Sequence, residues 1–112
     1  MLQKRQRLSP ANFPRRTKKA RFSGYFIVKT IPNTRGDNRF AIVVGAKVEK
    51  KAVRRNFWKR RIAGILQGIP PRGDDYLIVA LPKLAALPPR DLRKEVFAAI
   101  GESEPVGIFR SH

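Results

Sequence analysis

The chain has 112 residues, with 25 Lys or Arg against eight Asp or Glu, so its formal net charge at pH 7 is +17. One modest hydrophobic core fits this length, and a hydrophobic fraction of 42% is too high for a disordered basic tail. The sequence has no cysteine, which excludes disulfides, Cys-ligated zinc and thiol chemistry, and no apolar run is long enough to cross a membrane.

The excess of basic residues predicts a polyanionic partner. Domains this basic are most often nucleic-acid binders, because Lys and Arg that neutralise phosphates release condensed counterions. A membrane surface, or charge that serves only solubility, is the less favoured interpretation. Residues 1–7 carry charges with no apolar segment behind them, so we expect a cytoplasmic protein without a signal peptide or a membrane partner.

A short first helix is predicted after residue 8. Ser9 and Asn12 are both candidate N-caps, and Pro14, which a helix tolerates only in its first turn, favours Asn12. The helix would carry Phe13 among several basic residues. By itself, Phe13 is equally consistent with core packing and with a functional role.

Two β-rich stretches follow at residues 24–31 and 39–46, joined by turn-forming residues. The short connection predicts an antiparallel hairpin. Strand alternation places Phe26 and Val28 on one face of the sheet and Ile27 and Lys29 on the other. The second face also carries Lys47 at the end of the second strand, so we expect a shallow basic trough there.

The stretch from 47 to 67 organises the rest of the chain. Seven of the twelve residues from Lys50 to Arg61 are Lys or Arg and none is acidic. At about 100° per residue, one arc of a helix here is apolar and a second arc points the other way. The apolar arc contains Trp58, Ile62, Ile65 and Leu66, and the second arc contains Asn56, Lys59, Arg60 and Ala63. We therefore predict a helix that anchors one face in the fold and presents fixed cations to a polyanion.

Three glycines punctuate the predicted helices. Gly68, followed by Pro70, is expected to end the central helix at its C′ position. Gly64 stands alone inside that helix and suggests a close-packing position. Gly101 is expected to terminate the last helix.

The remaining elements complete an α+β pattern. Residues 74–81 predict a strand buried on both faces, and Asp74 and Asp75 at its start need no role beyond solvation. Pro89 then opens a final helix, with residues 82–89 as a connector. The order of elements is αββαβα, with helices packed on a small mixed sheet.

The sequence offers no self-sufficient catalytic chemistry. Its one histidine, His112, lies in the C-terminal tail, and there is no Ser-His-Asp set and no Gly-rich phosphate loop. The adjacent carboxylates Asp74 and Asp75 do not make a two-metal site by themselves. We therefore assign no catalytic residue and no metal site to the chain, which is interpreted as a binding protein.

The central helix also carries a recognisable motif. Ala52 and Val53, then Arg55 and Asn56, then Lys59 and Arg60 reproduce the pattern Ala-Val-x-Arg-Asn-x-x-Lys-Arg, after a strand that ends in Lys47. This resembles the signature helix of the bacterial ribonuclease P protein subunit. The resemblance covers roughly residues 4–100, with departures from the family pattern at Thr17, Lys29, Ala46 and Ala63.

The family fold implies two features that the residues alone do not show. A short extra strand is expected before the hairpin, and residues 21–23 are the candidate. The strand–helix–strand unit would cross over left-handed, as in the related second domain of a small-subunit ribosomal protein, although right-handed crossovers are the rule. From the residues themselves we expect a basic arm (1–8), a single RNA-binding domain (9–101) and a C-terminal tail (102–112).

The resemblance also implies a function. The chain would be the non-catalytic protein subunit of ribonuclease P, an endoribonuclease and hydrolase whose RNA subunit removes the 5′ leader of precursor tRNA. Mg²⁺ would act in the holoenzyme without a dedicated protein site, and the protein would be a monomer in a 1:1 ribonucleoprotein. Residues implied to bind the catalytic RNA are Lys50, Lys51, Arg55, Asn56, Lys59 and Arg60. Residues implied to bind the leader are Phe13, Ile27, Lys29 and Lys47.

Two alternatives remain open at this point. A structural RNA-binding module, such as a ribosomal protein, would explain the charge but not the motif. A DNA-binding regulator with the central helix in a major groove is less favoured, because no second helix of a helix-turn-helix lies next to it.

Overall fold

A computed structural model of the chain describes residues 7–8, 19–33 and 36–101. The first predicted helix with Phe13 and the C-terminal tail lie outside these residues. The strands are β1 (Lys19–Phe22), β2 (Phe26–Pro32), β3 (Arg39–Val43) and β4 (Asp74–Ala80). The helices are α1 (Ala52–Leu66), α2 (Leu92–Ile100) and two short 3-10 helices, Pro82–Ala86 and Pro89–Asp91.

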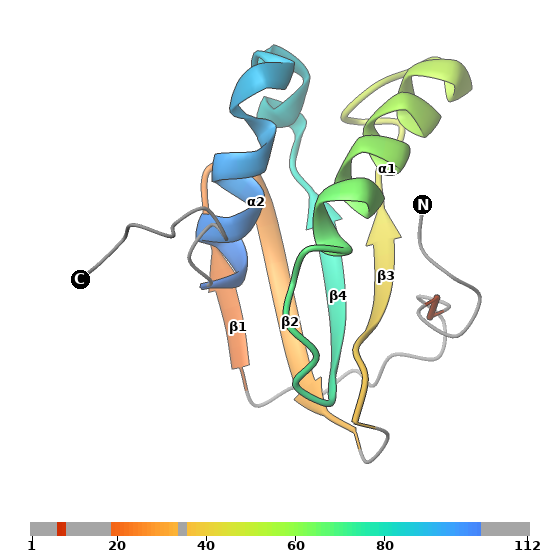
Figure 1. Cartoon of the computed structure of the whole chain (residues 1–112). Helices are drawn as coiled ribbons and strands as arrows, with labels where there is room; N and C mark the ends of the chain where they lie inside the picture. The colour runs from red at the N-terminus through yellow and green to blue at the C-terminus, as the bar shows by residue number, and fades with distance from the viewer. Residues whose placement is uncertain (1–6, 9–18, 34–35, 102–112) are drawn as a thin grey trace.

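The four strands form one mixed sheet in the order β1-β2-β4-β3 (Figure 1). The strand implied before the hairpin is present as β1, about two residues earlier than expected, and it pairs antiparallel with β2. The predicted hairpin between β2 and β3 is wrong. β4 lies between them, antiparallel to β2 and parallel to β3.

The central place of β4 has a physical reason. Its run Tyr-Leu-Ile-Val-Ala is apolar at every position, and a central strand buries both edges and most of both faces. Its burial alternates, however. Tyr76 and Ile78 are buried on the helix side, whereas Leu77 and Val79 are half-buried on the other.

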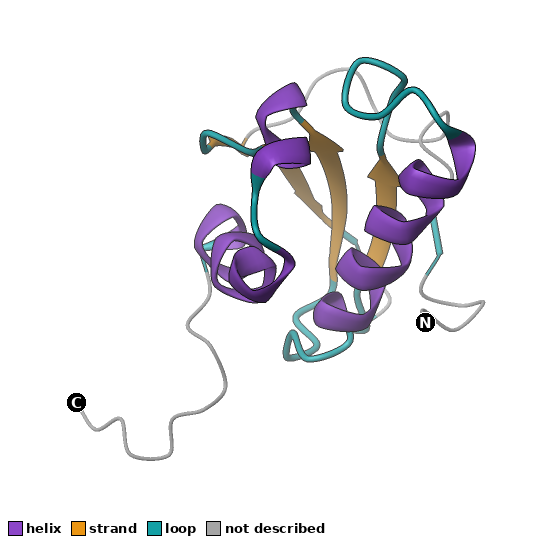
Figure 2. Ribbon diagram, turned by 90° about the horizontal axis from the view of Figure 1, so that it is seen from above, coloured by secondary structure: helices purple, strands orange, loops and turns teal. Residues whose placement is uncertain are grey.

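The connection from β3 through α1 to β4 is left-handed, as the resemblance implied. In Figure 1 both strands point upward, α1 returns downward in front of the sheet, and β4 lies to the left of β3. Both α1 and α2 cover the same face of the sheet (Figure 2). The opposite face is called the open face below, because no helix of the described residues lies on it.

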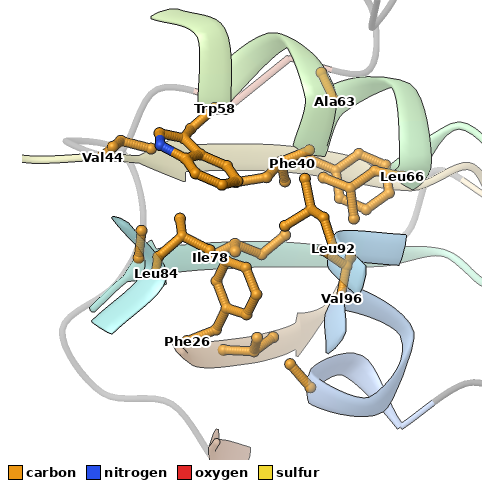
Figure 3. Packing of buried hydrophobic residues seen from close by; sticks show 14 of the residues in the cluster. Phe26, Phe40, Val44, Trp58, Ala63, Leu66, Ile78, Leu84, Leu92 and Val96 are labelled. Atoms are coloured by element: carbon orange, nitrogen blue, oxygen red, sulfur yellow. The ribbon is translucent and has the colours of Figure 1, made fainter. Parts of the chain in front are cut away.

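The core lies between the sheet and the two helices (Figure 3). Trp58, predicted to be a core residue, is 1% exposed and packs with Ile62 and Leu66 against the sheet. Ile65 is only half-buried. Ala63 is 8% exposed, so its assignment to the outward arc is wrong. The buried side of α1 is therefore turned about the helix axis relative to the prediction, towards Ala63 and away from Ile65.

The two main helices end differently. Gly101 has φ 87° and caps α2 in the left-handed conformation, as predicted. Gly68 has no positive φ, and α1 instead ends in a tightened turn in which the N–H groups of Gly68 and Ile69 bond to the carbonyls of Ile65 and Leu66. Gly64 is not a close-packing position, because an added Cβ there would meet nothing within 4 Å.

The sequence suggested that Asp75 is a solvated residue at the start of a strand, and this prediction is wrong. It is 5% exposed and accepts two hydrogen bonds from the Arg39 guanidinium, at 2.9 and 2.6 Å. Asn33 donates to the same carboxylate at 2.7 Å. The hydrogen bonds from Arg39 to Asp75 raise the pKa of Arg39 above its ordinary value. This buried cluster ties the β2–β3 connection to β4, and so holds β2 and β3 on opposite sides of that strand.

Candidate nucleic-acid interface

The outward face of α1 carries two exposed cations and an exposed amide side by side. Asn56, Lys59 and Arg60, together called the basic α1 face, are exposed on the same side of the helix. No acidic residue lies within α1. Because Trp58 and Ile62 are buried behind them, the backbone that carries these side chains is held in place.

The basic α1 face borders a cavity of about 360 Å³ between α1 and the edge strand β3. Its floor is apolar and comes from Phe40, Ile42 and Ala63. Arg7 adds a further cation to its rim, because Leu8 donates a backbone hydrogen bond to Phe40 at 2.9 Å and so holds residues 7–8 against β3. The sequence did not predict this place for Arg7.

Arg55 bonds to the chain's own backbone. It is half-buried, and its Nη1 donates to the backbone carbonyls of Glu49 and Lys50 at 3.0 and 2.8 Å. These bonds brace the turn that leads into α1. The structure thus gives Arg55 a supporting role that the motif did not indicate, while its contact with RNA stays a prediction.

The same turn is fastened to the core through Glu49. The Trp58 indole N–H donates to the Glu49 carboxylate at 3.1 Å, and Arg54 approaches that carboxylate at 3.6 Å. Glu49 therefore fixes the loop between β3 and α1 against the buried side of the helix.

Three lysines that the sequence assigned to two different partners lie around one concavity. Lys47, Lys50 and Lys51 are all exposed and line a cavity of about 660 Å³ beside Arg54. Lys47 was expected to bind the leader, and the other two were expected to bind the catalytic RNA. The structure joins them into one basic loop surface next to the N-terminus of α1.

Ile27 and Lys29 lie on the open face, as predicted. In the strand register, Ile27 is opposite Val79 and Lys29 is opposite Leu77, while Val28 faces the core. Both Ile27 and Lys29 are half-buried. They are separated from the basic α1 face by the sheet, so the two groups of residues lie on different surfaces of the molecule. Phe13, the remaining predicted leader contact, lies outside the described residues.

Phe57 is a residue of α1 that the sequence reasoning did not single out. Its ring lies between the guanidinium groups of Arg54 and Arg61, 5.1 and 4.8 Å from the centroid. Cation–π contacts of this kind hold both arginines at the helix surface. The i−3 and i+4 spacing around an aromatic residue was the signal that could have found them.

The described residues contain no group of three or more His, Cys, Asp or Glu that could hold a metal ion. Within the same part of the chain, no helix is long and apolar enough to cross a membrane. What the arrangement offers is fixed positive charge, apolar floor and amide hydrogen bonding, which are the means by which proteins bind RNA.

The chain is similar to proteins of known kind. A model of the family described as Ribonuclease P matches residues 2–104. The RNase P protein from Thermotoga maritima in complex with 1-(4-fluorophenyl)-2-thiourea is 29% identical, with a TM-score of 0.65 over 71% of this chain and 80% of that chain. A Staphylococcus aureus RNase P protein mutant with defective mRNA degradation activity is 23% identical, with a TM-score of 0.72 over 88% and 87% of the two chains, and shares the fold. No curated protein sequence matches the chain.

Proposed function

Because the chain belongs to the ribonuclease P protein family, we propose that it is the non-catalytic protein subunit of a tRNA-processing ribonucleoprotein. In this proposal one protein binds one catalytic RNA in the cytoplasm, and the RNA hydrolyses the bond between the 5′ leader and mature tRNA. Family membership also favours this reading over a ribosomal protein or a DNA-binding regulator.

The observation that carries the proposal is the separation of two RNA-compatible surfaces by the sheet. The basic α1 face, with its cavity against β3, suits the catalytic RNA, and Lys50 and Lys51 extend it at the helix start. The open face, with Ile27 and Lys29, suits an extended single strand such as the leader, and Lys47 belongs to the loop surface that it shares with Lys50 and Lys51. A protein with both surfaces can hold substrate and ribozyme at once.

Mg²⁺ enters the proposal through the RNA. The cofactor supplies the charge stabilisation that phosphodiester hydrolysis needs, at the assembled holoenzyme rather than at a dedicated protein site. The protein's own cations act beside it by lowering the repulsion between two RNAs.

The first test is reconstitution. Purified protein alone is expected to leave precursor tRNA intact at every Mg²⁺ concentration, and adding it to the catalytic RNA is expected to lower the Mg²⁺ concentration needed for cleavage. Correct 5′ maturation by RNA-free protein, in a preparation shown to contain no contaminating nuclease, would contradict the non-catalytic assignment.

The second test separates the two surfaces. Arg60→Ala is expected to weaken binding to the catalytic RNA by about 1.5–3 kcal/mol, the range for hydrogen bonds to charged groups. Lys29→Ala is expected to reduce the preference for precursor over mature tRNA instead. If both variants weaken both partners equally, a diffuse basic shell replaces the two-surface proposal.

A further inference from the structure

Phe22, the last residue of β1, is an aromatic side chain that the fold leaves in solvent. It is 74% exposed, and among the described residues only Val53, at 77%, is a comparably exposed large apolar side chain. A single exposed apolar residue is ordinary on a protein surface. The exposure of Phe22 therefore indicates a binding site only if the neighbouring residues and the rigidity of its backbone support one.

The backbone beneath Phe22 is firmly held. β1 and β2 are joined by a tight turn in which the Ser23 hydroxyl accepts hydrogen bonds from the N–H groups of Tyr25 and Phe26, at 3.2 and 3.0 Å. The Ser23 N–H donates in turn to the Phe26 carbonyl at 2.8 Å. Because Phe22 is paired with Ile27 just before this turn, its ring projects from a fixed strand end.

The register of the sheet places Phe22 on the open face. Phe22 is opposite Ile27, Ile27 is opposite Val79, and Val79 is opposite Val43, which makes one apolar row across all four strands. Side chains in successive paired positions share a face. The row thus runs from the surface proposed for the leader to the β1 edge, and Phe22 is its aromatic end.

A cation accompanies this row. Lys29 is two residues beyond Ile27 on the same strand and the same face, in the register next to Phe22, where side chains lie on the order of 7 Å apart. An aromatic plane beside a cation is the combination by which proteins bind single-stranded nucleic acid, with the base on the ring and the phosphate on the charge.

The charge of the whole chain selects among possible occupants. β1 is an edge strand, and an edge strand can pair with a second copy of the same chain. Two chains that each carry +17 repel one another, however, whereas a polyanion is attracted. RNA is therefore the occupant that the described surface favours.

We propose that Phe22 is a stacking platform for one unpaired nucleobase in the 5′ leader of precursor tRNA, with Lys29 on the adjoining phosphate. The inference rests on the proposed function and deepens it. It widens the leader-binding surface to β1, which none of the predicted contact residues reaches.

The test compares Phe22→Leu with Phe22→Trp in the reconstituted ribonucleoprotein. Leu keeps the apolar bulk without an aromatic plane, and Trp restores the plane. Phe22→Leu is expected to weaken binding of leader-bearing precursor by about 5- to 20-fold, the lower part of the range for one stacked base. Mature tRNA is expected to bind as before, and Phe22→Trp is expected to bind precursor like the original protein.

A second readout locates the base. Precursors with 2-aminopurine at successive leader positions are expected to show quenched fluorescence at one position when bound, and Phe22→Leu is expected to relieve that quenching. Val53→Ala, which removes a similarly exposed side chain from α1, is the matched control and is expected to leave the precursor-over-mature ratio unchanged.

Each contrary result has a distinct meaning. If the original protein prefers precursor and Phe22→Leu keeps both the preference and the quenching, Phe22 is no platform, although the proposed function stands. If the original protein shows no preference for precursor, the function and this inference fail together. If Phe22→Leu leaves RNA binding intact but abolishes a dimer seen by sedimentation, the occupant is a second copy and the inference is overturned.

Discussion

At the scale of single residues, α1 divides its side chains between two tasks. Trp58 fills the core and fixes Glu49 through its indole N–H, whereas Arg60 is exposed at the cavity beside β3. Arg55 shows that a basic residue within a binding motif can serve the fold, because it bonds to the chain's own carbonyls. The charge of a side chain therefore does not tell which of the two tasks it performs.

Trp58→Ala and Arg60→Ala are expected to separate stability from binding. Removing a large buried aromatic costs about 3–5 kcal/mol, and a domain of this size has about 5–15 kcal/mol in total. Trp58→Ala is thus expected to melt at a much lower temperature and to lose RNA binding through partial unfolding. Arg60→Ala is expected to melt normally and bind the catalytic RNA less well, as followed by circular dichroism and filter binding. A normal melt for Trp58→Ala combined with lost binding would place Trp58 on RNA and contradict its burial.

At the scale of elements, replacing Gly64 and replacing Gly101 by alanine are expected to change the stability of the protein in opposite directions. Gly64 lies in the exposed interior of α1 with open space around it, so Gly64→Ala is expected to raise stability by about 1 kcal/mol through helix propensity. Gly101 has φ 87°, and an added Cβ would lie 2.8 Å from Arg21 Cζ, so Gly101→Ala is expected to lower stability by about 1 kcal/mol or more. Chemical denaturation of the two variants checks both signs. If Gly64→Ala lowered stability as much as Gly101→Ala, α1 would not be helical through Gly64.

The cluster around Asp75 determines how the strands are joined. Asp75→Ala leaves Arg39 without its buried partner, a change that costs about 3–5 kcal/mol in buried ion pairs, so about 3 kcal/mol is expected for this half-buried arginine. Asp74→Ala is the matched control, because Asp74 is half-buried and, among the described residues, its carboxylate accepts only a 3.4 Å bond from Tyr76. Urea unfolding is expected to show a loss of less than about 1 kcal/mol for the control. Comparable losses would mean that the ion pair does not hold the β2–β3 connection.

At the scale of the whole molecule, the net charge is expected to govern RNA binding. If about 6–8 basic side chains contact phosphate, the logarithm of RNA affinity is expected to fall with the logarithm of salt concentration at a slope of about −4 to −7. Titrations at several salt concentrations, with the catalytic RNA and with precursor tRNA measured separately, give the two slopes. A slope near zero would show that the net charge of +17 is not what binds RNA.

The sequence by itself determined the features that depend on local periodicity and composition. The apolar spacing from Trp58 to Leu66 predicted a helix with one buried side. Strand alternation predicted that Phe26 and Val28 lie on one face of the sheet and Ile27 and Lys29 on the other. Such patterns can be recognised in the sequence because side-chain direction repeats with a fixed period along a helix or a strand. The net charge, likewise, needs no structure to predict a polyanionic partner.

Only the tertiary structure decided which strands pair and which polar side chains are already in use. β4 enters between β2 and β3, where its apolar run lies inside the sheet, and Asp75 meets Arg39 across 36 residues of chain. The same pairing sets Phe22 in one row with Ile27, which no stretch of sequence shows. Contacts between distant segments are chosen by the burial and hydrogen bonding of the whole chain, so a local period cannot reveal them.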